Sequence, residues 1–438
     1  MQAPPASSRF DVLVIGFGTT VSMWSVGYIS HLPFTVIPSI IVGVAMLLLL
    51  VAGGWFAGRF TARGWRGGFF VGLISSILNL LVLGSLLSGN QPNEIQRSML
   101  IWLPGSLLLG AVLGAIGGAL GNAAQKTPPP AREWTSLFAG VASVATYLLL
   151  VIGGLVTSKA AGLAVVDWPN SFGYNMFLYP LSRMTGGIYF EHAHRLFGAL
   201  VGLTALVLAI RLWGVEERRW LKKLGALALL CVIVQGVLGG LRVTGHFTLS
   251  TSPNEVAPNL ALAVVHGVLG QIIFSLIVAI AVVTSATWRN PPALTTARTA
   301  NTDHLACSIL IAFVIVQLVL GAIQRHFAAG LHIHITLGVL VVGVGSWAGA
   351  RAWGLYPAQP LVSRLGLVLT QVMGIQFILG MLALVGKGLT QDPANPPLLK
   401  VITTTAHQAV GALALGLAVV LALWIRRLIV AEESAQPY

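Results

Sequence analysis

Twelve apolar runs, each long enough to cross a bilayer as a helix, follow one another along the 438-residue chain. A bilayer core needs about 20 consecutive apolar residues, and within it a backbone satisfies its own hydrogen bonds only as a helix or a closed barrel. The composition, 56% hydrophobic and 8% charged, fits the same class. We therefore predict an all-α polytopic membrane protein with spans at about 11–30, 37–58, 68–89, 100–122, 135–157, 190–213, 222–242, 259–286, 304–324, 332–353, 364–386 and 401–425.

The distribution of basic residues predicts the orientation of these spans. An even number of spans puts both termini on one side. Of the 25 Lys and Arg residues, seventeen fall in or beside the loops on that side and eight on the other. Short cytoplasmic loops are enriched in Lys and Arg, so we expect a multi-pass protein of a bacterial-type cell membrane with both termini cytoplasmic. This bias also accounts for the net charge of +13 without a nucleic-acid partner.

A Pro-rich linker at 125–134 divides the chain. Residues 1–124 contain four spans with no histidine inside them, and the sequence assigns this domain no function. Small residues let membrane helices approach closely, so we expect tight packing around the fourth span, with Gly110, Gly114, Gly117, Gly118 and Gly121. After the linker, residues 135–290 and 303–428 hold four spans each.

These two four-span parts are copies of one another. At an offset of 168, Leu150–Gly154 matches Leu318–Ala322, and the sequence Ala-Ala-Gly-Leu at 160–163 recurs at 328–331. After a shorter loop the offset falls to 140 or 141, and it then pairs His194 with His334, Gln235 with Gln376, and His266 with His407. Four spans per copy give both copies the same topology, so these are parallel repeats.

Each copy therefore carries one histidine on its second helix and one on its fourth. All four histidines lie near the outer ends of their spans, and two imidazoles facing across a four-helix bundle can hold a b-type haem iron from both sides. A lone membrane histidine is more often a hydrogen-bonded core residue, but four at equivalent positions favour ligation. We expect a glycine four residues after each histidine to leave room for the macrocycle: Gly198, Gly270, Gly338 and Gly411.

Two further points concern the histidines. His332 competes with His334, but the register of Gly338 favours His334. His246, His304 and His326 lie in loops or at span ends, and we expect them to be solvated.

Glu191 distinguishes the first copy from the second. We interpret it as the one acid on a predicted span, and an ionisable residue at membrane depth is by default a functional candidate. His194 follows three residues later, on the same helical face. The counterpart of Glu191 in the second copy is Leu331. Of the two bundles, only the first therefore carries a candidate catalytic acid.

At these residues the chain resembles the haem A synthase family. The resemblance covers about residues 134–428, and four elements carry it: Glu191-x-x-His194-Arg195-x-x-Gly198, Gln235-x-x-Leu238-Gly239-Gly240-Leu241-Arg242-Val243, His266, and Asp167-Trp168-Pro169 in the first outer loop. Two departures stand out. The four N-terminal spans lie outside the family pattern, and the cysteine pair that many relatives carry in the outer loop is missing between Thr157 and Tyr189.

The resemblance implies oxidation of a haem O methyl group to the formyl group of haem A through a hydroxymethyl intermediate, for terminal oxidase biosynthesis. It implies that His194 and His266 hold the iron of substrate haem O, that His334 and His407 hold a permanent haem b, and that Glu191 is the catalytic acid or base. Arg195 and Arg242 are assigned to haem binding, Arg242 by pairing with propionates. Expected partners are haem O, membrane lipid, a quinone or other electron acceptor, haem O synthase and a terminal-oxidase assembly factor.

Two alternatives stay open at the level of sequence. A dihaem b-type cytochrome that only transfers electrons from quinol to an acceptor needs the four histidines but gives no reason for Glu191. A transporter built from parallel repeats explains the repeat but not four equivalent histidines at one depth.

Overall fold

The computed structural model describes residues 9–33, 35–89, 91–245, 258–390, 392 and 395–432. Twelve helices in this part of the chain are long and apolar enough to cross a membrane. The prediction of an all-α polytopic membrane protein is therefore confirmed. The contacts divide the chain into two units: Met1–Leu149 with Gly162–Arg211 and Phe247–Val256, and Leu150–Ala161 with Leu212–His246 and Ala257–Tyr438.

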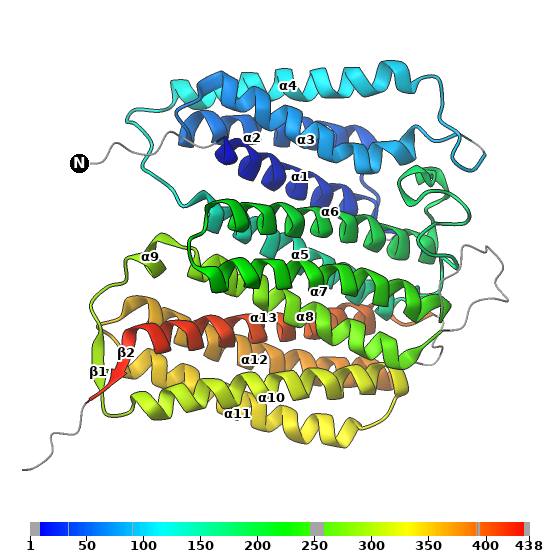
Figure 1. The fold of residues 1–438 in the computed structure, drawn as a ribbon. Helices are drawn as coiled ribbons and strands as arrows, with labels where there is room; N and C mark the ends of the chain where they lie inside the picture. The colour runs from blue at the N-terminus through cyan, green and yellow to red at the C-terminus, as the bar shows by residue number, and fades with distance from the viewer. Residues whose placement is uncertain are drawn as a thin grey trace, which may run out of the picture. The chain divides into compact units, whose positions relative to one another are not determined.

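The first unit contains the N-terminal helices and the chain that leads into the second helix of the first copy (Figure 1). Its helices are α1 (Phe10–Ser30), α2 (Ser39–Phe60), α3 (Gly64–Leu86), α4 (Met99–Ala123), most of α5 (Trp134–Ser158) and most of α6 (Gly186–Val215). The segment between α5 and α6, residues 159–185, is the loop predicted to lie on the outer side and is called the outer loop below. It includes two short 3₁₀ helices, η1 (Met176–Leu178) and η2 (Leu181–Arg183).

Glycines bring the backbones of α2, α3 and α4 into contact. A Cβ at Gly54 would lie 2.1 Å from the carbonyl oxygen of Gly114, and one at Gly72 would lie 1.9 Å from that of Gly110. A Cβ at Gly121 would meet the carbonyl oxygen of Trp55 at 2.1 Å. No side chain fits at these distances, so the close packing predicted for the fourth span is confirmed.

The second unit contains α7 (Arg219–Thr244), α8 (Leu260–Val283), the short α9 (Ala286–Arg289), α10 (Ala300–Phe327), α11 (Leu331–Leu355), α12 (Pro360–Gly388) and α13 (Leu398–Leu428). Helices α10 to α13 contact one another in cyclic order and form a four-helix bundle. Strands β1 (Thr295–Ala297) and β2 (Ile429–Ala431), which the sequence did not predict, form a short parallel pair.

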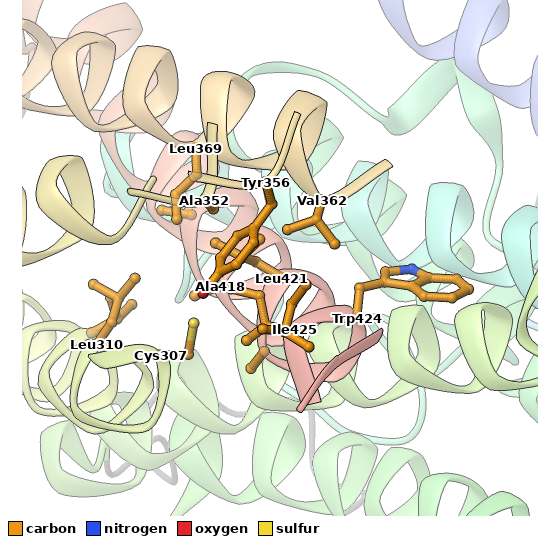
Figure 2. Packing of buried hydrophobic residues seen from close by; sticks show 14 of the residues in the cluster. Cys307, Leu310, Ala352, Tyr356, Val362, Leu369, Ala418, Leu421, Trp424 and Ile425 are labelled. Carbon is orange, nitrogen blue, oxygen red and sulfur yellow. The ribbon is translucent and has the colours of Figure 1, made fainter. Parts of the chain in front are cut away.

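The core of this bundle lies among the halves of α10 to α13 nearest the predicted cytoplasmic side (Figure 2). Leu310, Leu369 and Leu421 are fully buried there, together with Tyr356. The Tyr356 hydroxyl donates a hydrogen bond to Asp303, whose carboxylate also accepts one from Arg351 at 2.7 Å. Apolar packing therefore holds this end, and the other end is left for the histidines near the starts of α11 and α13.

Candidate functional site

Glu191 lies in the second turn of α6 and is 3% exposed. Its Oε1 forms an ion pair with Nε of Arg195 at 3.3 Å, one helical turn further on. Both side chains are buried, at 4% and 8% exposure. Burying a carboxylate is costly without a close cationic or hydrogen-bonding partner, and Arg195 supplies both.

Arg195 also holds the outer loop against α6. Its Nη1 donates to the carbonyl oxygens of Asp167 at 2.7 Å and Asn170 at 2.9 Å, and its Nη2 to that of Val165 at 3.1 Å. A guanidinium has five N–H donors and no acceptor, so most of its capacity goes to the loop and to Glu191. This geometry gives Arg195 a loop-holding role, which the sequence did not suggest.

Asp167 and His192 complete this part of the site. The Asp167 carboxylate, fully buried, accepts hydrogen bonds from the backbone N–H groups of Phe172 at 2.7 Å and Gly173 at 2.8 Å. His192, also fully buried, pairs through Nδ1 with Ser171 at 3.0 Å. The segment that begins with Asp167 is therefore folded as an ordered cover over the start of α6.

In the second bundle His334 on α11 faces His407 on α13. Their ring centroids are 6.3 Å apart and their planes cross at 86°. An imidazole bonds a metal ion at roughly 2 Å, so two rings sharing one ion have centres roughly 6 Å apart. The spacing of these two rings therefore fits a pair of axial ligands to one haem iron.

Glycines on the neighbouring helices form cradles for three of the histidine rings. A Cβ at Gly321 would lie 3.0 Å from Cε1 of His334. A Cβ at Gly380 would lie equally close to Cε1 of His407, and so would one at Gly239 to Cε1 of His266. Nδ1 of His266 lies 3.1 Å from the carbonyl oxygen of Gln235. A carbonyl only accepts, so Nδ1 carries the hydrogen, which leaves Nε2 as the nitrogen for a metal.

The glycines four residues after the histidines have a different role from the one predicted. At Gly270, Gly338 and Gly411 a Cβ would meet the amide nitrogen of a glutamine on the adjacent helix, at 3.2, 2.9 and 3.2 Å. Gln235 and Gln317 use these positions to donate to the backbone oxygens of His266 and His334, at 2.7 and 2.8 Å. In these three cases the space serves a glutamine, because a carboxamide clamping a helix must lie close to its backbone.

His332 is exposed on α11, whereas His334 is partly buried and turned toward the bundle. His194 lies on α6 in the first unit, and His266 and Arg242 lie on α8 and α7 in the second. A Cβ at Gly198 would find nothing within 4 Å.

Several sequence interpretations need correction. Asp11 and Asp303 also lie on membrane-length helices, so Glu191 is not the one acid there; both pair with arginines, Arg63 and Arg351. His304 is not simply solvated, because it lies on α10 and its Nε2 bonds the backbone oxygen of Ile429 at 3.1 Å. His326 is partly buried in the last turn of α10, and His246 lies outside the described residues.

Comparison with known families adds an independent result. Residues 136–336 match the family COX15-CtaA, described as cytochrome oxidase assembly protein. These residues make up a little under half of the chain, and over them the chain is similar to that family. The match includes Glu191, Arg195, His194, His266 and His334, and it ends before His407. A comparison with curated proteins gave no match.

The COX15-CtaA match begins after the Pro-rich linker, so the N-terminal helices α1 to α4 are not part of it. The family relates residues 136–336 to cytochrome oxidase assembly. The buried Glu191–Arg195 pair and its loop fall inside this region, and so does the first of the two facing histidines of the second bundle.

Proposed function

We propose that this protein is a haem A synthase, which oxidises a methyl group of haem O to a formyl group through a hydroxymethyl intermediate. The observation that carries the proposal is the buried Glu191–Arg195 pair on the same helix as His194, within the region that matches the oxidase assembly family. Leu331 takes the place of Glu191 in the second copy. A carboxylate at only one of two equivalent positions fits a substrate site in the first copy.

In this proposal the two copies have different tasks. His194 and His266 hold the iron of the substrate haem O, and His334 and His407 hold a permanent haem b. Haem b supplies one-electron transfer toward an outer acceptor or a membrane quinone when it is bound. The facing rings of His334 and His407 and the cradles at Gly321 and Gly380 support this assignment. Both haem sites lie near the outer face, with both termini cytoplasmic.

Glu191 takes the protons in the proposed chemistry. Each of the two oxidation steps removes protons and electrons from the substrate carbon, and water supplies the oxygen. If His194 and His266 both hold the iron of the substrate, they would leave dioxygen no open position on it, which favours this route. Arg195 fixes the orientation of the carboxylate, and the outer loop limits water access. Arg242, near the outer end of α7, is proposed to pair with a propionate.

The test is expression in a host that makes haem O but not haem A, followed by extraction and chromatography of the pigments. The wild-type chain is expected to yield haem A. Glu191→Gln keeps the size of the side chain and loses its charge, so turnover should fall roughly 10²–10⁴-fold, the usual contribution of a general base. Glu217→Gln, at an exposed acid of the α6–α7 link, is the matched control and should be unaffected.

Three other outcomes are informative. Haem b alone in both sites, unchanged by Glu191→Gln, would identify a dihaem cytochrome. A purified protein without colour would contain no haem, and of the alternatives only the transporter would then remain. Formyl oxygen drawn wholly from labelled dioxygen would rule out the water route.

A further inference from the structure

We propose that the N-terminal four-helix domain positions the proposed site: α1 supports the back of α6, and the end of α3 with the α3–α4 loop holds the outer loop. This rests on the proposed function for its catalytic consequence, but its structural part is independent of it. All the residues involved belong to the first contact unit. The domain lies outside the family match and has no other assignment.

Helix α1 packs against α6 through aromatic rings. Tyr189 stacks on Tyr28 with centroids 5.5 Å apart, and Trp24 meets Phe197 edge to face at 5.3 Å. The Tyr189 hydroxyl donates to the backbone oxygen of Tyr28 at 2.6 Å. That oxygen is in the last turn of α1, where carbonyls lack a full helical partner, so Tyr189 also caps the end of α1.

The residues that face α1 leave the other side of α6 for chemistry. At about 100° per residue, Tyr189 and Phe197 share one face, and Glu191 and Gly198 lie on the opposite one. Glu191 is two residues from Tyr189, so a shift of Tyr189 along or around the helix axis displaces the carboxylate directly.

The end of α3 and the α3–α4 loop hold the outer loop from the other side. The Ser85 hydroxyl donates to the backbone oxygen of Phe177 at 3.2 Å, and Asn93 Oδ1 accepts from the backbone N–H of Asn175 at 2.7 Å. A Cβ at Gly84 would lie 2.4 Å from the Phe177 oxygen, so this glycine is required for the approach. Asn93 has φ of 63°, a conformation that asparagine tolerates better than most residues.

The domain is stiff enough to act as a support. Backbone contact at the glycines locks α2, α3 and α4 together. Helix α1 is tied to α3 by the bond from Thr20 to Ser75 at 3.0 Å and by the bond from Trp24 Nε1 to Asn79 at 3.0 Å. A site held by residues that are themselves fixed keeps its reactive geometry, and small displacements of a catalytic group lower the rate sharply.

The first experiment measures hydrogen exchange of the full-length protein in detergent. Asn93→Gly keeps the backbone conformation and removes only the acceptor, so backbone exchange around Asn175 should rise roughly three- to tenfold, as expected for one lost hydrogen bond. Asn93→Asp keeps an acceptor and should restore the wild-type rate. Ser22→Ala removes a hydroxyl that bonds only within α1, to Gly18, and is the control.

The second experiment uses Tyr189→Phe, which keeps the stacked ring and removes the hydroxyl. Exchange at the start of α6 should rise, and kcat for haem O should fall by roughly threefold or more with a smaller change in KM. Haem b content should stay constant, since α10 to α13 are untouched. Unchanged exchange over residues 165–195 in both Asn93→Gly and Tyr189→Phe would overturn the proposal. If the wild-type protein makes no haem A but the two variants still show these exchange changes, the proposed function alone would be overturned.

Discussion

At the scale of single residues, the second bundle fits its imidazoles against backbone rather than against side chains. A Cβ added at Gly321 or Gly380 would lie 3.0 Å from the nearest carbon of the facing imidazole ring, which is closer than side-chain carbons normally pack. Each ring is thereby fixed from behind by a helix that cannot yield locally. A ligand held in this way reaches a metal with little freedom to rotate, and such preorganisation favours tight binding.

Gly380→Ala tests this arrangement. The added methyl group meets Cε1 of His407 and must push the ring aside, at a cost of about 1–3 kcal/mol for overpacking. We expect roughly tenfold weaker haem b retention and a shifted midpoint potential, measured by reduced-minus-oxidised spectra during redox titration. Gly374→Ala lies on the same helix with nothing within 4 Å of the new Cβ and is the control. Equal haem content in both variants would contradict the cradle.

The contrast between histidines and glutamines explains what sequence reasoning missed. Repeat register brought out His334 and His407, because coordinating side chains recur as one residue type at fixed positions. The glutamine clamp was present in the same register, at Gln235 and Gln376, but its role depends on where the amide points. Pairing between helices is set by crossing geometry, which spacing within one helix does not encode.

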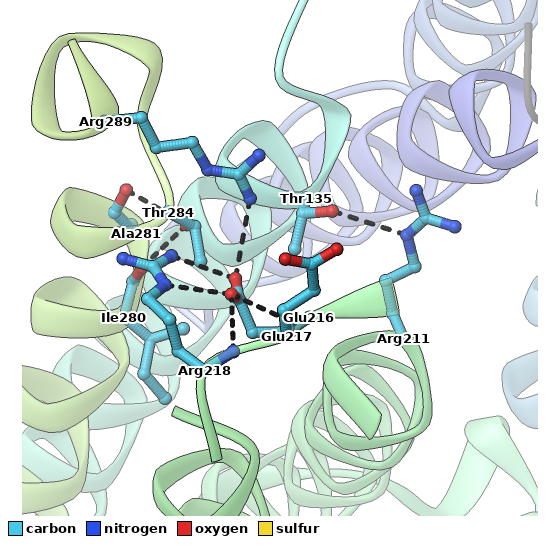
Figure 3. A network of polar contacts seen from close by, with 9 residues as sticks. All are labelled: Thr135, Arg211, Glu216, Glu217, Arg218, Ile280, Ala281, Thr284 and Arg289. Carbon is cyan, nitrogen blue, oxygen red and sulfur yellow. Dashed lines mark hydrogen bonds and ion pairs between the residues drawn. The ribbon is translucent and has the colours of Figure 1, made fainter. Parts of the chain in front are cut away.

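At the scale of elements, a charged cluster links the end of α6 to α9 (Figure 3). Glu216, in the α6–α7 link, pairs with Arg218 at 2.8 Å and with Arg289 at 3.4 Å. The hydrogen bond from Arg218 is the main cause that lowers the pKa of Glu216, to about 2. The ion pair between Arg289 and Glu216 therefore holds the short helix α9 to the α6–α7 link.

This shift has a defined effect on stability against pH. The folded pKa lies below the ordinary value of 4.5, so the stabilisation is complete above that value and is lost as pH falls toward 2. We expect Glu216→Gln to lower the unfolding free energy by about 1–2 kcal/mol at neutral pH, because the partner arginines are partly exposed. Thermal unfolding in detergent at pH 3 and pH 7 measures it. The difference between variant and wild type should shrink at pH 3, and a gap that widens there would contradict the assignment.

Elements differed in how far the sequence predicted them. The long helices followed from apolar length alone, since a membrane span admits few other structures. The ends were less certain: α6 begins at Gly186 rather than near 190. The outer loop could not be predicted in detail, because its fold depends on Arg195, Asp167 and Asn93, which are distant in sequence and meet only after folding.

At the scale of the whole molecule, residues from the N-terminal domain and from the first copy share a contact unit, although a Pro-rich linker separates them in the sequence. Such a linker indicates where the chain changes direction and not which surfaces later pack together. Helix–helix packing in a membrane depends on small residues and rings at matching depths, here the aromatic contacts of α1 with α6.

Orientation is the remaining property of the whole molecule, and the excess of Lys and Arg beside alternate loops predicts it. Ser182 in the outer loop and Glu217 in the α6–α7 link are both exposed and lie at opposite ends of α6. In a background with Cys231→Ala and Cys307→Ala, an impermeant maleimide should label the Ser182→Cys variant in intact cells. The Glu217→Cys variant should be labelled only after lysis. The reverse pattern would place Glu191 and the four histidines on the cytoplasmic side, and electron transfer to an outer acceptor would then be ruled out.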